Sequence, residues 1–171
     1  MTNQALERAQ QSLKIHDVWI RFANAWIADD YDPIYSPLHS PGTQFKHAVA
    51  RFTLAELTPA TADQARQALY LFRVYLDLGM RLVTGQDEDK NFSGKSNQDA
   101  SVLAKVEATM VAEYHAAEDP GYEALDAVAA KNASYHVWPF WREYLVSQCE
   151  RMRLPRVFIP TMQLPTEKNK S

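Results

Sequence analysis

Residues 69–83 alternate between apolar side chains and others, and this alternation limits the possible folds more than any other feature of the sequence. The odd positions include Arg73, Asp77 and Arg81. The even positions are apolar throughout: Tyr70, Phe72, Val74, Leu76, Leu78, Met80 and Leu82. Because successive side chains of a strand point to opposite faces, the pattern predicts a long strand in a sheet with one covered face. A helix is the competing interpretation, because alanine-rich residues 60–68 lead into this segment.

Three further segments show the same period of two, so the sequence predicts four strands. The clearest of them covers 101–115, where apolar residues hold every even position from Val102 to Tyr114. Residues 13–27 and 45–57 alternate less completely. Residues 84–100 lie between the two clearest strands and are polar and lightly acidic, so we expect a mobile insertion there.

The connection between the first two strands, residues 28–44, holds three prolines and one glycine. This composition predicts a long loop. The loop nevertheless carries four large apolar residues: Tyr31, Ile34, Tyr35 and Leu38. Large apolar side chains do not stabilise a loop that is surrounded by water, so we expect these four to contact another part of the protein or a ligand.

The period changes from two to that of a helix after Asp119 and Pro120, which are typical of a helix start. We expect a first helix from there to about residue 132. A second helix is expected from about Val137 to Met152, with Pro139 in its first turn, where a missing N–H group costs nothing.

After the second helix, residues 156–165 are extended and apolar, and we expect residues 165–171 to be loose. A run of strands followed by a run of helices predicts one α+β domain over residues 1–171. Its expected architecture is a four-stranded antiparallel sheet with two C-terminal helices on one face.

The second predicted helix is unusually rich in aromatic residues: residues 134–145 have the sequence SYHVWPFWREYL. At about 100° per residue, its apolar arc covers about half of the circumference, more than one sheet face requires. The surplus face needs the C-terminal segment, another subunit or a transient ligand as its partner. The plainer interpretation is that all of these aromatic residues serve the core and subunit contacts.

Several segments resemble the SecB family of chaperones, in the order in which that family has them. WPFWRE at 138–143 resembles the FPYARE-type segment of the family's second helix, and Ser147, Arg151 and Pro155 match downstream. HDVWIRFAN at 16–24 is similar to the family's first strand. The long insertion is more like the SecB-like chaperones associated with toxin–antitoxin modules. The final residues, TEKNKS, do not resemble the tail that binds the SecA motor.

The resemblance implies an ATP-independent holdase, a chaperone that binds unfolded or aggregation-prone polypeptides in an apolar groove. Its clients would be exported proteins or an antitoxin, with SecA as a possible partner of the chaperone and a homotetramer as its assembly. The family's groove lies between the connection after the first strand and the second helix. Carried over to this sequence, the groove-lining residues are Trp26, Ile27, Tyr31, Ile34, Tyr35, Leu38, Trp141, Tyr144, Leu145 and Val157.

Other residues argue against catalysis and cofactors. No GxxxxGK[ST] loop is present, and five glycines are few for a nucleotide cradle. The five histidines form no HxH or HxxxH pair, so we expect no metal site. Cys149 lies on the apolar stripe of the second helix and is expected to be a buried, inert thiol. We therefore expect a protein that is not an enzyme.

The net charge of −3, with scattered Lys and Arg, gives no sign of nucleic-acid binding. No apolar run reaches the roughly 18 residues of a membrane span, and the N-terminus lacks the order of a signal peptide. With one cysteine, these features favour a cytoplasmic protein without membrane insertion. Two alternatives to a holdase stay open: a structural adaptor whose aromatic helix serves one fixed partner, and a small-ligand-binding protein.

Overall fold

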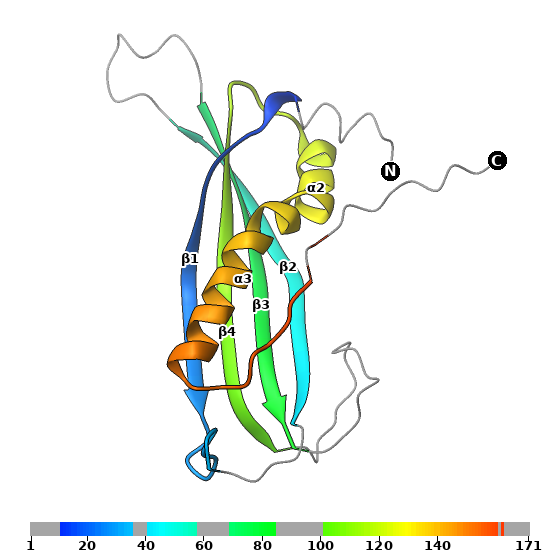
Figure 1. Cartoon of the computed structure of the whole chain (residues 1–171). Helices are drawn as coiled ribbons and strands as arrows, with labels where there is room; N and C mark the ends of the chain where they lie inside the picture. Colours follow the sequence, from blue (N-terminus) through cyan, green and yellow to red (C-terminus); the bar gives the residue numbers. More distant parts are fainter. Residues whose placement is uncertain (1–10, 36–40, 58–68, 85–100, 161, 163–171) are drawn as a thin grey trace, which may run out of the picture.

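Within the described residues, four long strands form one antiparallel sheet in the order β1-β4-β3-β2, and two helices cover one of its faces (Figure 1). The computed structural model describes residues 11–35, 41–57, 69–84, 101–160 and 162. The elements are β1 Lys14–Ile27, β2 Gly42–Leu57, β3 Leu69–Val83, β4 Val102–Ala116, α2 Tyr122–Lys131 and α3 Ala133–Arg151. The predicted α+β architecture is therefore confirmed. The predicted mobile insertion, apart from Thr84, and the predicted loose end at 165–171 lie outside the described residues.

The two central strands, β3 and β4, supply most of the core. Their even-numbered side chains, from Phe72 to Leu82 and from Ala104 to Tyr114, are buried and belong to one apolar cluster with the helices. β3 pairs with β4 in a register that places Leu76 opposite Met110. The alternation thus marked a strand, and the competing helix interpretation of 69–83 is wrong.

The opposite face of the sheet, which no described helix covers, carries charged side chains in ion pairs. Glu113 accepts a hydrogen bond from Nε of Arg73 at 2.8 Å, and Lys46 lies 3.4 Å from Asp77. We call this surface the helix-free face. Odd positions of β3 tolerate charges because the charged side chains have partners on neighbouring strands. Arg81, the third of them, donates a hydrogen bond from its Nε to Oε1 of Gln44 at 2.7 Å.

α3 packs on the sheet through one narrow stripe. Val137, Trp141, Leu145 and Cys149 follow each other at four-residue spacing, and all four are buried. This spacing places them along one face of the helix, as a helix lying on a single sheet requires. The remaining aromatic residues of α3 therefore lie beside the contact with the sheet or face away from it.

The start of α3 differs from the prediction. The helix begins at Ala133, four residues before Val137, so Pro139 lies in the helix interior and its predicted place in the first turn is wrong. Pro139 cannot donate a hydrogen bond to the carbonyl of Tyr135. Burial of Ala133 and Ser134 against the core offsets this loss, because tertiary packing outweighs local helix propensity.

Two hydrogen bonds attach the first turns of α3 to the sheet. Ser134 Oγ lies 2.8 Å from Nε2 of His47 on β2, and His136 Nδ1 lies 2.8 Å from the hydroxyl of Tyr114 on β4. Desolvation by burial lowers the pKa of both histidines. Both contacts thus hold neutral imidazole rings between helix and sheet.

We expect Leu145→Ala to lower the free energy of unfolding by about 2–5 kcal/mol, because it leaves a cavity between α3 and the sheet. Val146→Ala is the matched control, since Val146 is the neighbouring residue and is exposed. It should change stability by no more than about 0.5 kcal/mol. Urea unfolding followed by far-UV circular dichroism measures both, and equal losses would contradict the packing of α3 described above.

Acid should weaken the attachment of α3 through His136. Its folded-state pKa lies below the ordinary value of 6.5, so the unfolded chain binds the proton more tightly. The contribution of His136 to the free energy of unfolding is therefore fully present above about pH 6.5, and it is lost as the pH falls through the folded-state pKa. We expect His136→Gln to lose less stability than the wild type between pH 7.5 and 5 in urea titrations. Identical pH dependence in the two proteins would show that His136 does not contribute.

Candidate functional site

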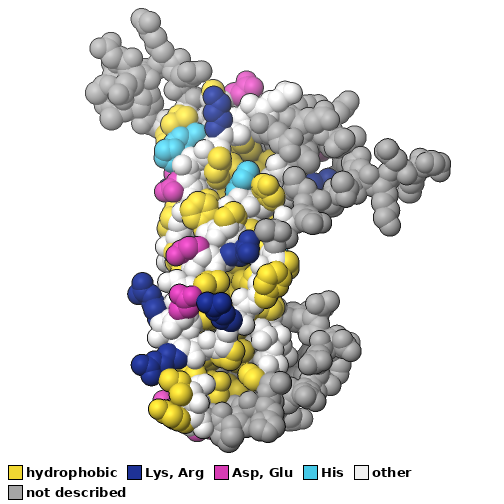
Figure 2. Space-filling view, viewed as in Figure 1, with side chains coloured by type: hydrophobic (Ala, Val, Ile, Leu, Met, Phe, Trp, Pro, Cys, Tyr) yellow, Lys and Arg dark blue, Asp and Glu magenta, His cyan; other side chains and the backbone are white. Residues whose placement is uncertain are grey.

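The exposed large apolar side chains on the helix-bearing side of the molecule include those of the connection after β1 and of the two long edges of α3. Figure 2 shows hydrophobic side chains gathered at the end of the molecule where this connection lies, and mixed with charged side chains over α3. Soluble proteins seldom leave such side chains together without a use. These three places are therefore the first candidates for a functional surface.

The connection after β1 folds back on itself through a short turn. The amide of Ala28 donates to the carbonyl of Leu103 at 2.8 Å, and the Asp32 carboxylate accepts hydrogen bonds from the amides of Ile34 and Tyr35. This turn leaves Ile34 half exposed and Tyr35 83% exposed. The connection lies at the same end of the molecule as the C-terminal end of α3 (Figure 1).

One edge of α3 faces β2, and we call it the β2 edge. Trp138 lies on this edge, because the centroid of its ring is 5.7 Å from that of His47 on β2. Its Nε1 donates a hydrogen bond to the carbonyl of Pro160 at 2.8 Å. The segment after α3 is extended here: Ile159 is buried, whereas its neighbour Phe158 is 85% exposed. Trp138 thus joins β2 to this extended segment and leaves Phe158 in solvent.

The other edge of α3 faces β1, and we call it the β1 edge. Tyr144 lies about 120° around the helix from Trp138, since the two are six positions apart and six steps of about 100° fall about 120° short of two full turns. It is half-buried, and its ring centroid lies 6.0 Å from that of Trp141. Phe140, on the same edge, is half exposed. Burial raises the pKa of Tyr144, which remains a neutral hydrogen-bonding group at ordinary pH.

The structure separates the ten predicted groove residues into three groups. Tyr31, Trp141 and Leu145 are buried in the core cluster. Ile27, Ile34, Tyr35, Tyr144 and Val157 are half-buried or exposed. Leu38 lies outside the described residues, and Trp26 is treated below. The expectation that Tyr31, Trp141 and Leu145 form open walls is corrected, because their surfaces are used by the core.

Trp26 lies on the helix-free face, so it cannot share a groove with α3. It pairs with Lys105, whereas its neighbour Ile27 pairs with Ala104, which is a core residue beneath the helices. Alternation along the strand therefore sends the two side chains to opposite faces. Val157 belongs to the extended segment after α3 and is half-buried against the core cluster.

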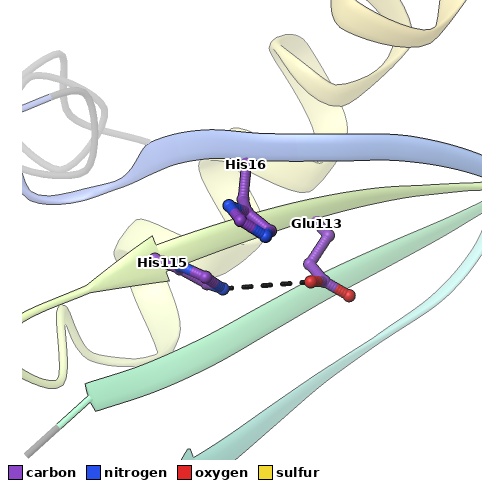
Figure 3. Close-up of side chains that lie close together, drawn as sticks. All are labelled: His16, Glu113 and His115. Atoms are coloured by element: carbon purple, nitrogen blue, oxygen red, sulfur yellow. Dashed lines mark ion pairs between the residues drawn. The ribbon is translucent and has the colours of Figure 1, made fainter.

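The structure also brings together a cluster that the sequence analysis did not predict: His16, Glu113 and His115 (Figure 3). Glu113 and His115 are two residues apart on β4 and so share a face, and His16 reaches them from β1. The sequence does hold a signal for this cluster, the ExH pair of Glu113 and His115 on a predicted strand, although its histidines form no HxH or HxxxH pair. Beside His115 lies a cavity of about 580 Å³ that is also lined by Lys14, Leu69 and Glu118.

Cys149 is buried, as predicted. Burial raises the pKa of its thiol to about 11, so the reactive thiolate is scarce at neutral pH. Among the described residues, no helix is long and apolar enough to cross a membrane.

Comparison by sequence and comparison with solved structures both find similarity to a SecB-like chaperone. The SecB-like chaperone Rv1957 of Mycobacterium tuberculosis (strain H37Rv) is 27% identical over 114 residues, which cover 64% of this chain and 63% of that protein. The chain thus matches less than two thirds of its relative's length. No family model matches the sequence.

The solved structure of Rv1957 in complex with a ChAD peptide from the Rv1956 HigA1 antitoxin superimposes on this chain with a TM-score of 0.57. The alignment covers 96% of this chain and 100% of that one, at 19% sequence identity. The resemblance to SecB-like chaperones that the sequence indicated is therefore confirmed, and the chain has the SecB-like fold.

Proposed function

We propose that this protein is an ATP-independent chaperone that holds unfolded polypeptide segments on the apolar surface around α3. The observation that carries the proposal is the exposure of large apolar side chains on both edges of α3 and on the neighbouring connection. The exposed rings of α3 stand on a helix whose buried stripe already fills its contact with the sheet. A rigid support for exposed aromatic rings suits a binder of many sequences, because rings offer area without requiring one exact shape.

The expected energies are compatible with holding a client reversibly. Burying about 600 Å² of apolar surface gives on the order of 15 kcal/mol before costs. Ordering a flexible client and immobilising it offset most of this gain. The remainder corresponds to micromolar or somewhat tighter binding at one surface, and several surfaces in one assembly would strengthen it.

An antitoxin is the client class that we favour over exported proteins delivered to SecA. The relative Rv1957 was solved with an antitoxin peptide. The acidic residues Asp77, Glu107 and Glu113 on the helix-free face are each paired with a basic side chain. Their charges are therefore largely neutralised locally, which leaves little acidic surface there for a basic patch on a motor protein.

Both edges of the sheet support assembly into an oligomer, which we propose to be a tetramer by resemblance to SecB. β1 and β2 are the outer strands, with 14 and 16 residues, and neither has a second strand partner among the described residues. Long open edges invite pairing with other chains unless they are covered. A second copy of this chain would cover them.

The first test is suppression of aggregation without nucleotide. At stoichiometric amounts, the purified protein should slow the light scattering of several unrelated unfolded clients, and added ATP should not change the effect. Clients that aggregate as fast as they do in buffer would refute the holdase proposal. Protection of a single client would instead support a structural adaptor with one fixed partner.

The second test locates the surface by substitution. We expect Tyr35→Ser to weaken client binding about three- to tenfold, since an exposed ring contributes on the order of 1 kcal/mol. Tyr122→Ser is the control, because Tyr122 is 71% exposed and lies at the opposite end of the molecule, at the start of α2. Fluorescence anisotropy of a labelled unfolded peptide measures the binding, and thermal melts check the fold.

A pair of further variants distinguishes the two edges of α3. Phe140→Ser removes an exposed ring from the β1 edge, and Phe158→Ser removes one beside the β2 edge. Loss of binding in one variant assigns the client to that edge, and loss in both assigns it to both. If neither variant nor Tyr35→Ser weakens binding, the proposed surface is wrong.

A further inference from the structure

A β-bulge near the start of β1 turns His16 toward β4. The pairing with β4 shifts between Ile15 and Asp17, so His16 is the extra residue of the bulge. Lys14 pairs with His115 and Asp17 pairs with Glu113, so the bulge lies directly opposite the Glu113–His115 pair. Bulges aim a side chain differently from regular strand geometry and are common beside functional sites.

The three side chains converge within the range of a metal centre. The rings of His16 and His115 stack with centroids 4.0 Å apart and planes 20° apart. Nε2 of His115 lies 3.8 Å from Oε1 of Glu113. One ligand atom from each of the three residues lies within 4.8 Å of the others (Figure 3).

Arg73 orients the carboxylate of this cluster. Its Nε donates to Oε2 of Glu113 at 2.8 Å, so that oxygen is occupied while Oε1 is the one nearer His115. The guanidinium of Arg73 in turn lies 5.9 Å from the ring of Trp19. A carboxylate fixed by an outer partner is the usual arrangement of a ligand at a metal site.

The other described histidines differ from these two. His47 bonds to Ser134 and His136 bonds to Tyr114, and both contacts attach α3 to the sheet. His16 and His115 make no such contact with the helices. They stack on each other across the β1–β4 pair, beside the carboxylate of Glu113.

We propose that His16, Glu113 and His115 bind a zinc ion. Two imidazoles and one carboxylate are a ligand set that zinc prefers, with bonds of about 2.0–2.2 Å. Ligands of a tetrahedral ion lie about 3.4 Å apart, so the side chains need to close by less than about 1.5 Å. One of the two stacked rings must also turn out of the stack, so that both nitrogen lone pairs point at the ion. The fourth position stays open to water, because His16 is exposed on the edge strand.

The ion would clip the start of the edge strand β1 to the central strand β4. Two cationic groups lie nearby, Arg73 on Glu113 and Lys14 opposite His115, and they reduce the attraction for a divalent ion. We therefore expect micromolar rather than nanomolar affinity. Bound zinc should raise the melting temperature by several degrees when it is in large excess over its dissociation constant.

Isothermal titration of the full chain with zinc chloride tests the proposal. The wild type should bind one ion per chain at this site, and His16→Gln and His115→Gln should each weaken binding at least tenfold. His47→Gln is the control, because His47 lies on the far edge strand and should leave zinc affinity unchanged. Cobalt(II) provides a second readout, since coordination by the cluster gives visible absorption that the two variants lose.

Three outcomes would overturn the proposal: no zinc binding by the wild type up to about 100 µM, unchanged affinity in both cluster variants, or an equal loss in His47→Gln. Melting curves without metal show that the variants are folded. His16→Gln is the safer variant in this respect, because its side chain is exposed. None of these measurements uses a client, so their failure leaves the chaperone proposal untouched.

Discussion

The packing of α3 on β3 and β4 determines which surfaces of this molecule remain free. One stripe of the helix, with Trp141 and Leu145 at its centre, fills the space above the even-numbered side chains of the two central strands. A single sheet can bury only one such stripe of a helix. The aromatic surplus of α3 is thereby divided into two edges, with Tyr144 toward β1 and Trp138 toward β2. Which aromatic side chains of α3 remain available to a partner therefore depends on which stripe of the helix packs on the sheet.

The strands could be predicted from the sequence because alternation is a strong local signal. The predicted segment 69–83 coincides with β3, and 101–115 differs from β4 by one residue at each end. The start of α3 could not be predicted in this way. Pro139 is a local signal for a helix start, but the burial of Ala133 and Ser134 depends on contacts with the sheet, which no local pattern reveals.

The arrangement of the predicted groove residues could not be predicted from the sequence. The predicted residues mixed core and surface, because an angular plot of a helix does not say which stripe meets the sheet. Trp141 and Tyr144 are neighbours on such a plot, yet one is 1% exposed and the other half-buried. The position of Trp26 was predictable in principle, since adjacent strand residues point to opposite faces. The approach of His16 to His115 was not, because it depends on a bulge and on the pairing of β1 with β4.

The two proposed sites lie toward opposite ends of β1, and this separation has a physical consequence. His16 is near the start of the strand, whereas Ile27 ends it and leads directly into the connection that carries Ile34 and Tyr35 (Figure 1). An ion at the start would fix the pairing of β1 with β4 without covering the apolar surface at the other end. Because β1 is an edge strand, β4 is its only strand partner in the part of the chain that the structure describes. A zinc ion at the start of β1 would therefore fix the register of β1 against β4. The same strand positions the exposed connection that follows Ile27.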